Sequence, residues 1–403
     1  MKTIKNYNNA VIAGLTRNPQ KGMLKQVQHD VQSSIIICLA GVILTACSDW
    51  TKVEPVDFEK SVTDIETIKT DEYYAALREW KNTPGLPQTY VWFDSWAGSS
   101  PTGRNSLRGL PDSVTIASNW GGHPKFKLTP DRKADMEYVQ RVKGTKVVVT
   151  LFSSKTGDDM PYDPIYDDCK SGSSDEAVVR PAIRKYAEAI HDAVVETGYD
   201  GYDWDYEPGF GGKPAEDHLW YNKVQRTIFV EELSYWFGKG ASDPDRDRDG
   251  RKPAKPGLLF LIDGSIGCGH RMDTTWVSYY VDHFILQAYS GNRLQGRVSD
   301  VIVDMRDHIR TGKITKEEVV RRTILTENFE SFAVTGGGVL NMSRYVHTAD
   351  GIEQQIGGFG IYRPVFDYAQ GKGDYLGSPE WWFLRHGITN LYRVYNERKE
   401  NSE

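Results

Sequence analysis

Three acidic residues alternate along one short segment of the chain. Residues 200–207 read D-G-Y-D-W-D-Y-E, so Asp203, Asp205 and Glu207 occupy every second position. In a β-strand, alternate side chains point to the same face, so the three carboxyl groups should share one face at steps of about 6–7 Å. Crowded carboxylates repel one another and resist desolvation, which raises their pKa values. The spacing therefore predicts a proton donor suited to general acid catalysis.

The opposite face of this segment is aromatic. It carries Tyr202, Trp204 and Tyr206. Such bulky residues suit a strand that is buried. Pro208 and Gly209 follow at once and end the strand, because proline has no N–H with which to continue a ladder. Glu207 is therefore expected at the C-terminal tip, as the outermost of the three acids.

Eight apolar runs alternate with helical stretches in the rest of the chain. They span residues 89–96, 114–120, 146–152, 201–207, 258–264, 283–289, 323–328 and 358–365. Several are near-continuous Val/Ile/Leu or aromatic runs, which are typical of parallel strands buried on both faces. Eight β/α units over about 310 residues predict an α/β fold, a (β/α)₈ barrel. A doubly wound open sheet is the alternative, but no Gly-rich phosphate loop follows the first run.

Helical spacing of apolar residues predicts the helices between these strands. Two of them cover residues 71–81 and 179–194. Ser173 and Glu176 have the spacing of a capping box for the second helix, and Gly198 is its expected stop. Residues 378–380 read S-P-E and predict the start of the last helix, with Ser378 at the N-cap and proline at N1.

The first 46 residues are interpreted as a targeting segment. Positions 35–44 form an apolar run of about ten residues, too short to span a bilayer. Residues 44–47 read L-T-A-C, and small residues before a cysteine resemble a bacterial lipoprotein signal. That resemblance implies a lipid on Cys47, a tether with a short helix over 47–87, and anchoring to the bacterial outer membrane. An ordinary signal peptide and a buried hydrophobic segment are the alternatives. Residues 1–22 are interpreted as an upstream extension, with Met23 as a second candidate start.

Composition narrows the class of partner. The net charge is −6 with acids and bases interspersed, so no basic tract is present to neutralise nucleic acid phosphates. The 11 Trp and 22 Tyr residues suit core packing or stacking against sugars. Cys169 and Cys268 remain in the mature chain, and both a disulfide and two free thiols are compatible with an exported protein.

No metal site is predicted. His123, His270 and His347 lack the spacing of metal ligands. Residues 243–250 resemble the start of a calcium loop, but Pro256 stands where the closing glutamate belongs. A solvated loop is the favoured interpretation of that segment.

The acidic segment resembles the motif of a known family. D-G-Y-D-W-D-Y-E resembles the D-G-x-D-x-D-x-E signature of glycoside hydrolase family 18, and it lies on the fourth predicted strand, where that family has it. Residues 287–289 read Q-A-Y, similar to the family's Q-x-Y segment at the end of strand six. The resemblance implies a (β/α)₈ catalytic domain over residues 88–395, without a cofactor. It also implies chitinase or endo-β-N-acetylglucosaminidase activity.

The resemblance assigns roles to individual residues. It implies that Glu207 protonates the glycosidic oxygen and then activates water, while the substrate's own 2-acetamido oxygen attacks. Asp205 would orient and stabilise that acetamide group, and Asp203 would share a proton with Asp205. Tyr289 would contact the acetamide oxygen, with Gln287 beside it. A purely structural Asp203 and a Tyr289 without substrate contact remain the alternatives.

Further residues at predicted strand tips are candidates for lining a sugar cleft. They are Trp96, Asn119, Trp120, Phe152 and Tyr362. Core packing is the alternative for each of them. As a whole, the sequence predicts a lipid-anchored endo-β-N-acetylglucosaminidase that cuts the chitobiose core of N-glycans. A chitinase and a non-catalytic glycan-binding protein on the same fold are the alternatives.

Overall fold

The computed structural model describes the part of the chain that contains the predicted barrel. The described residues are 69–121, 124–160, 169, 172–210, 213, 215–247, 250–253, 255–264, 266, 279–368 and 380–401. All of them belong to one unit, Thr51–Glu403. The predicted signal segment with its lipidation site Cys47, as well as His123, Cys268 and His270, lies outside the described residues. Within the ranges given, no helix combines the length and apolar character that crossing a bilayer requires.

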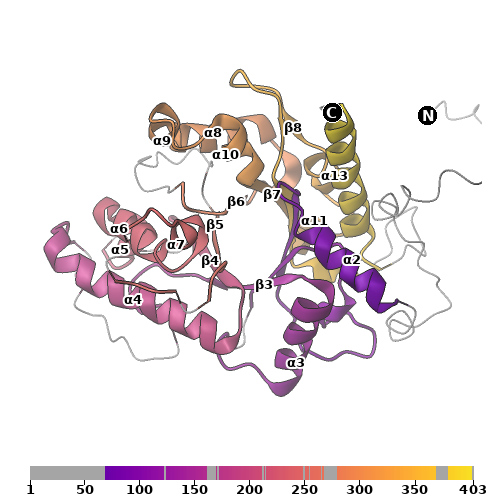
Figure 1. The fold of residues 1–403 in the computed structure, drawn as a ribbon, viewed down its shortest axis with the longest axis horizontal. Coiled ribbons are helices and arrows are strands. Elements are labelled where there is room, and N and C mark those ends of the chain that lie inside the picture. The colour runs from indigo at the N-terminus through magenta and orange to yellow at the C-terminus, as the bar shows by residue number, and fades with distance from the viewer. Residues whose placement is uncertain are drawn as a thin grey trace, which may run out of the picture. The chain divides into compact units, whose positions relative to one another are not determined.

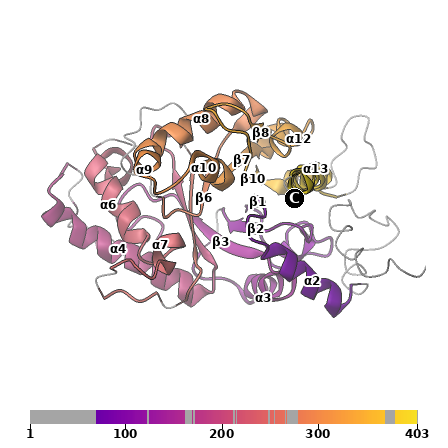
Figure 2. The same ribbon diagram turned by 45° about the horizontal axis from the view of Figure 1, so that its top comes forward.

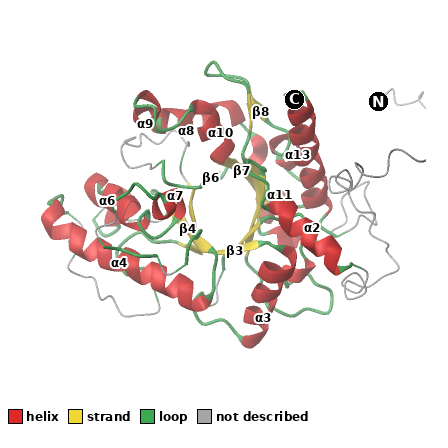
Figure 3. Ribbon diagram, viewed as in Figure 1, coloured by secondary structure: helices red, strands yellow, loops and turns green. Residues whose placement is uncertain are grey.

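The predicted parallel barrel is confirmed in the described part of the chain. Its eight strands close in the order β1-β10-β7-β6-β5-β4-β3-β2 (Figures 1 and 3). They are β1 (Gln88–Phe93), β2 (Ile116–Asn119), β3 (Lys146–Leu151), β4 (Gly201–Tyr206), β5 (Leu259–Gly264), β6 (His283–Leu286), β7 (Thr323–Asn328) and β10 (Gly358–Tyr362). Every neighbouring pair is parallel, so all the C-terminal strand ends meet at one end of the barrel, called the mouth below.

Helices surround the barrel (Figures 2 and 3). They are α2 (Asp71–Lys81), α3 (Pro130–Tyr138), α4 (Glu176–Thr197), α5 (His218–Tyr221), α6 (Lys223–Leu233), α7 (Gly238–Ser242), α8 (Leu294–Asp304), α9 (Arg306–Arg310), α10 (Lys316–Arg322), α11 (Phe329–Phe332), α12 (Val339–Met342) and α13 (Trp382–Glu400). A short antiparallel pair, β8 (Val346–His347) and β9 (Gln354–Gln355), lies outside the barrel sheet.

Two predicted helix starts are wrong. The N-cap of α4 is Asp175, whose side chain accepts from the backbone N–H of Ala177, whereas Ser173 lies further upstream. Helix α13 begins at Trp382, later than the predicted start near Ser378. The predicted stop at Gly198 is confirmed, because this residue has a φ of 97°, which glycine adopts without strain.

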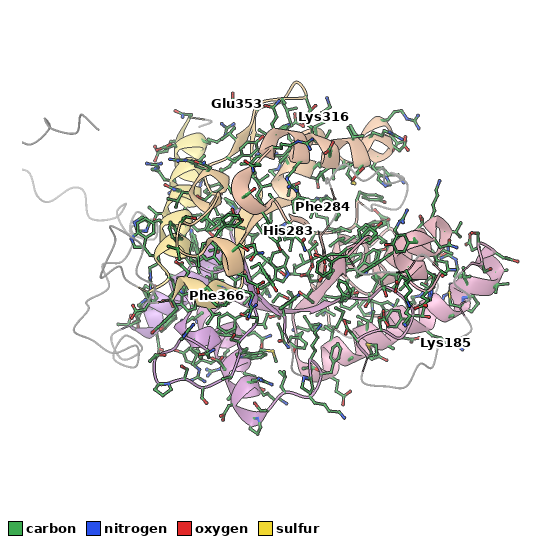
Figure 4. The ribbon with its side chains drawn as sticks, turned by 180° about the vertical axis from the view of Figure 1, so that it is seen from behind. Lys185, His283, Phe284, Lys316, Glu353 and Phe366 are labelled. Carbon is green, nitrogen blue, oxygen red and sulfur yellow. The ribbon has the colours of Figure 1, made fainter. Side chains whose placement is uncertain are left out.

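Strand alternation separates two apolar layers. The barrel interior contains Tyr90, Trp92, Ile116, Val148, Leu261, Ile285 and Ile324. The second layer packs between the strands and the helices, and on β6 it contains the fully buried Phe284, labelled in Figure 4. Phe284 and Ile285 are neighbours in sequence and belong to different layers. Side chains at alternate positions of one strand therefore share a face. Polar residues at inward positions near the mouth are therefore placed in one enclosed space.

Candidate active site

Strand β4 delivers the predicted acids into the barrel. Asp203 and Asp205 are inward residues of β4, with exposed fractions of 0% and 5%. Glu207 follows the last residue of β4, so it lies at the mouth above the other two. The structure therefore places three carboxyl groups in a column that runs from the barrel interior to its open end.

Asp203 is held by donors from three directions. Its Oδ2 accepts from the Tyr90 hydroxyl at 2.6 Å, from Thr150 Oγ1 at 2.8 Å and from Trp92 Nε1 at 3.3 Å. Burial raises the pKa of Asp203, and these hydrogen bonds oppose that rise because they stabilise the ionised form. Asp203 is thus the carboxyl of the column that is best equipped to carry a negative charge.

The surroundings of Asp205 disfavour a negative charge more strongly than those of Asp203. Burial raises its pKa well above the ordinary value for aspartate, and the negative charges of Glu207 and Asp203 add to this rise. Hydrogen bonding with Asp263 and the charge of Lys125 oppose it. This environment favours the protonated form of Asp205 over the ionised form.

Glu207 has the environment of an acid that keeps its proton. Burial raises the pKa of Glu207, and a hydrogen bond donated by Gln287 Nε2 to Glu207 Oε1 partly offsets the rise. The backbone of Gly264 passes close by, since a Cβ built there would lie 2.3 Å from the Tyr206 carbonyl oxygen and 3.2 Å from Glu207 Cγ. With a φ of 103°, this position requires glycine.

Replacing Gln287 with leucine should change the pH dependence of the site. The donated hydrogen bond stabilises ionised Glu207, so its loss should raise the pKa of Glu207 further. A general acid works only while protonated, so the alkaline limb of kcat/KM should move to higher pH. Rates measured from pH 4 to 9 by product release would show this, with Gln354→Leu as a control on β9. An alkaline limb that moves to lower pH would contradict the assignment.

Asp263 is a fourth acid in this space, and our sequence reasoning missed it. It lies on β5 directly across from Asp205 in the strand register, and only 1% of it is exposed. It follows the inward Leu261 by two positions, so it faces the barrel interior. An acid two positions after a core leucine, near a strand end, was the signal that could have identified it.

Several predicted residues meet around the mouth as a group of aromatic rings. Tyr362 lies edge-on to Trp120 with ring centroids 4.9 Å apart, and edge-on to Trp92 at 6.1 Å. Tyr289 stacks near Tyr362 at 6.5 Å. The charges of Asp263, Glu207 and Asp205 raise the pKa of Tyr289 in addition to its burial, so its hydroxyl faces the acids as a neutral donor. These rings provide apolar faces beside the carboxyl column.

Two predicted cleft residues face the outer layer instead. Trp96 is 2% exposed and its Nε1 donates to Asp135 Oδ2 at 2.8 Å, beneath α3. Asn119 is also 2% exposed, and its amide donates to the Tyr199 hydroxyl at 2.5 Å. Both predictions of cleft lining are therefore wrong, because these side chains pack between strands and helices.

Phe152 and Gln287 keep a place at the mouth. Phe152 directly follows β3, is 36% exposed, and lies edge-on to Trp220 at 4.5 Å. Gln287 contacts Glu207 itself, so it acts on the acid more directly than we expected from the sequence. Substrate contact by either residue stays a prediction.

Other polar groups of the described residues serve packing. Cys169 is a free buried thiol whose Sγ donates to Gln225 Oε1 at 3.0 Å, and His347 pairs with Asp350 at 2.8 Å. In the parts of the chain that the structure describes, no group of three or more His, Cys, Asp or Glu residues is arranged to hold a metal ion.

Comparison with known proteins identifies related sequences and folds. The model of glycoside hydrolase family 18, BT1044-like, matches residues 51–377. A solved structure of BT1044, in a selenomethionine form with a Glu-to-Gln substitution, is 27% identical. The match covers 82% of this chain and 95% of that one, with a TM-score of 0.58. No curated protein sequence matched.

Two fungal structures share the fold at lower identity. The apo endo-β-N-acetylglucosaminidase of Cordyceps militaris is 16% identical, with a TM-score of 0.52, and the match covers 80% of this chain and 96% of that one. A double mutant of that enzyme was solved in complex with fucosyl-N-acetylglucosamine-Asn. It is 14% identical, with a TM-score of 0.50 and the same coverage of the two chains.

Proposed function

Because the chain belongs to glycoside hydrolase family 18, in its BT1044-like group, we propose that it is an endo-β-N-acetylglucosaminidase. Its substrate is the chitobiose core of N-glycans, and it cleaves the β-1,4 linkage between the two N-acetylglucosamine residues. The observation that carries this proposal is the column of Asp203, Asp205 and Glu207, which ends with Glu207 at the open end of the barrel. A buried acid with a raised pKa at a substrate entrance is suited to protonating a leaving group.

The proposed mechanism uses the substrate's own acetamide as nucleophile. Glu207 donates its proton to the glycosidic oxygen, the bond from that oxygen to the anomeric carbon breaks, and the acetamide carbonyl oxygen bonds to the same carbon. Water then attacks this carbon, Glu207 takes one proton from the water, and the acetamide is released. Two displacements at one carbon retain its configuration, and the family is an exception to the rule of two catalytic carboxylates.

The other acids stabilise the charge that forms in this mechanism. The cyclic intermediate carries positive charge on the former acetamide. Asp205 lies two residues before Glu207 in the column, where its carboxylate can face that group. The three donors to Asp203 stabilise its ionised form, and Asp203 fixes Asp205 from below. Tyr289 supplies a neutral hydroxyl toward the acetamide oxygen.

The exposed aromatic side chains of the described residues are our basis for preferring cleavage at one site over binding along a polymer. The exposed large hydrophobic side chains of the described residues include two aromatics, Phe152 and Phe210. A long chitin chain is held by rows of exposed aromatic rings, whereas a branched glycan needs one short core site flanked by polar contacts. A chitinase is the second candidate within the family.

A glycan-release assay separates these two candidates. The purified protein is incubated with a high-mannose glycoprotein, with a complex-type glycoprotein and with chitin oligomers. The proposal predicts release of glycans that end in one N-acetylglucosamine, with one N-acetylglucosamine left on asparagine, as read by mass spectrometry. Cleavage of chitin oligomers alone would overturn the N-glycan assignment and retain the glycosidase. Tight binding of glycans without any product would favour the non-catalytic alternative.

The cellular location is a separate proposal that rests on the L-T-A-C segment before the barrel. A lipid on Cys47 would hold the enzyme at the bacterial outer membrane, next to glycans that the cell degrades. Cys47→Ser should move the protein from the membrane fraction to the soluble fraction. A protein that stays in the membrane fraction after this change would contradict lipidation at Cys47.

A further inference from the structure

Asp263 faces the catalytic acids from the neighbouring strand. It pairs with Asp205 in the register of β4 and β5 and is 1% exposed. The acids that act on it are Asp203 and Asp205 from β4 and Glu207 directly after β4. Two tyrosines also act on it, Tyr90 from β1 and Tyr289 from the segment after β6. Lys125 acts on Asp205 from the loop after β2. The fourth carboxyl therefore lies in a space that already contains three acids.

Three oxygens of this group have no donor within the described residues. They are Asp203 Oδ1, Asp205 Oδ1 and Asp263 Oδ2, and each is buried. Ionised carboxylates only accept hydrogen bonds, so three ionised groups here would face one another without a proton between them. Burial of several unpaired like charges carries a large cost in free energy. The arrangement therefore requires protons inside the cluster.

The contacts indicate which carboxyl keeps a proton. Asp203 accepts from Tyr90, Thr150 and Trp92, so it is prepared for the negative charge. In the proposed reaction Asp205 must face the positive acetamide as a carboxylate. That leaves Asp263, which takes no part in the proposed bond changes and lies beside both of the others. A protonated Asp263 has an O–H group that can donate to the neighbouring carboxylate oxygens, for which the described residues provide no other donor.

We propose that Asp263 is a positioning residue, whose protonated carboxyl donates to the Asp203–Asp205 pair and holds Asp205 in the orientation that the sugar acetamide requires. This proposal rests on the proposed function for its catalytic part, but the presence of the proton can be measured without substrate. In the proposed mechanism Asp263 has no part in the bond changes, so it acts through Asp205.

The electrostatic setting agrees with this geometry. Burial, followed by the charges of Asp203, Asp205 and Glu207, raises the pKa of Asp263 well above the ordinary value for aspartate. Hydrogen bonding with Asp263 lowers the pKa of Asp203 and that of Asp205. Removing the donor should therefore raise the pKa of the pair, so that the pair takes up a proton at higher pH than in the wild type.

Two variants of Asp263 test the catalytic part of the proposal. Asp263→Asn keeps the shape and a permanent N–H donor, so kcat should stay within about threefold of wild type. Asp263→Ala removes the donor, so kcat should fall by about 10- to 100-fold with little change in KM, since only the orientation of Asp205 is lost. For Asp263→Ala, the acid limb of kcat/KM should move up by about one pH unit, while for Asp263→Asn it should stay in place.

A matched control is available in the same barrel. Asp282 is another buried aspartate, which accepts from the backbone N–H of Phe260, and burial raises its pKa to about 6. It precedes β6 at the end of the barrel away from the mouth. Asp282→Asn should therefore leave the acid limb of the activity unchanged.

Infrared spectroscopy of the unliganded protein tests the proton itself. At pH 8 Asp282 is ionised, and the wild type should show a protonated carboxyl band that loses intensity in Asp263→Asn. This arm needs no substrate and no alanine variant, so it remains decisive if Asp263→Ala does not fold or if the proposed substrate is wrong. An unchanged band would overturn the proposal. Equal activities and equal acid limbs in folded Asp263→Asn and Asp263→Ala would overturn its catalytic part.

Discussion

Replacing Glu207 with glutamine should lower kcat by about 10⁴-fold while KM changes little, because the residue serves twice, as acid and then as base. The amide has nearly the shape of the carboxyl group, but its N–H is far too weak an acid to protonate the glycosidic oxygen. The hydrogen bond from Gln287 can still be accepted by the amide oxygen, so the local structure should persist. Initial rates of glycan release under saturating substrate measure the effect.

A matched surface variant and a binding measurement complete this test. Glu188 is exposed on α4, away from the mouth, and Glu188→Gln should keep wild-type rates. The Glu207→Gln protein should still bind the glycan, since the aromatic rings at the mouth are unchanged. If this variant and the wild type released glycans equally fast, Glu207 would not be the proton donor.

Replacing Asp205 with asparagine should lower kcat by about 10²- to 10³-fold, the size of effect expected when one group that stabilises a transition-state charge is removed. The amide is isosteric and can still form hydrogen bonds, but it cannot carry the negative charge that offsets the positive acetamide intermediate. Because this charge develops only during the reaction, KM should change far less than kcat. Steady-state kinetics on a defined N-glycopeptide separate the two constants.

The Asp205→Asn test has its own control and a contrary outcome. Asp131 is an exposed residue in the first turn of α3, and Asp131→Asn should preserve both kinetic constants. A large rise in KM with unchanged kcat for Asp205→Asn would show that Asp205 serves ground-state binding. That result would remove it from the proposed charge stabilisation.

The acid column could be predicted from the sequence because it depends on one local rule. Alternation along a strand fixes that Asp203, Asp205 and Glu207 share a face, and Pro208 fixes where the strand ends. The aromatic residues between these acids lie in the outer layer, as for Trp204, whose Nε1 donates to the Ser153 carbonyl oxygen at 2.9 Å. Local periodicity was enough to orient the whole segment.

The wrong predictions arose where a position at a strand tip was taken to mean that the side chain lines the cleft. The expected first strand ran to Trp96, but β1 ends at Phe93, and Trp96 is directed to Asp135, 39 residues further along the chain. Asn119 is the last residue of β2 and lies three positions after the inward Ile116, so alternation places it in the outer layer, where it pairs with Tyr199. A position at a strand tip does not determine which face of the sheet a side chain is on. Hydrogen-bond partners far along the sequence cannot be predicted from periodicity.

The same limit applies to Asp263 and to the last helix. The position of Asp263 beside Asp205 follows from the register between β4 and β5, which no single segment of the sequence predicts. Helix α13 begins with Trp381 as its N-cap in a left-handed conformation, and Asp367 accepts from the N–H groups of Phe383 and Leu384. A side chain from another segment thus supplies acceptors at this helix start, while Ser378, the predicted N-cap, lies outside the described residues.

The most direct measurement replaces the acetyl group of the scissile sugar with fluoroacetyl, difluoroacetyl and trifluoroacetyl groups. Fluorine withdraws electrons from the carbonyl oxygen without altering the rest of the substrate. An attack by that oxygen should slow at each step, and by about 10²- to 10³-fold for the trifluoroacetyl glycan. Equal cleavage rates across the series would show that the nucleophile is not the substrate's acetamide and would contradict the proposed chemistry of Glu207 and Asp205.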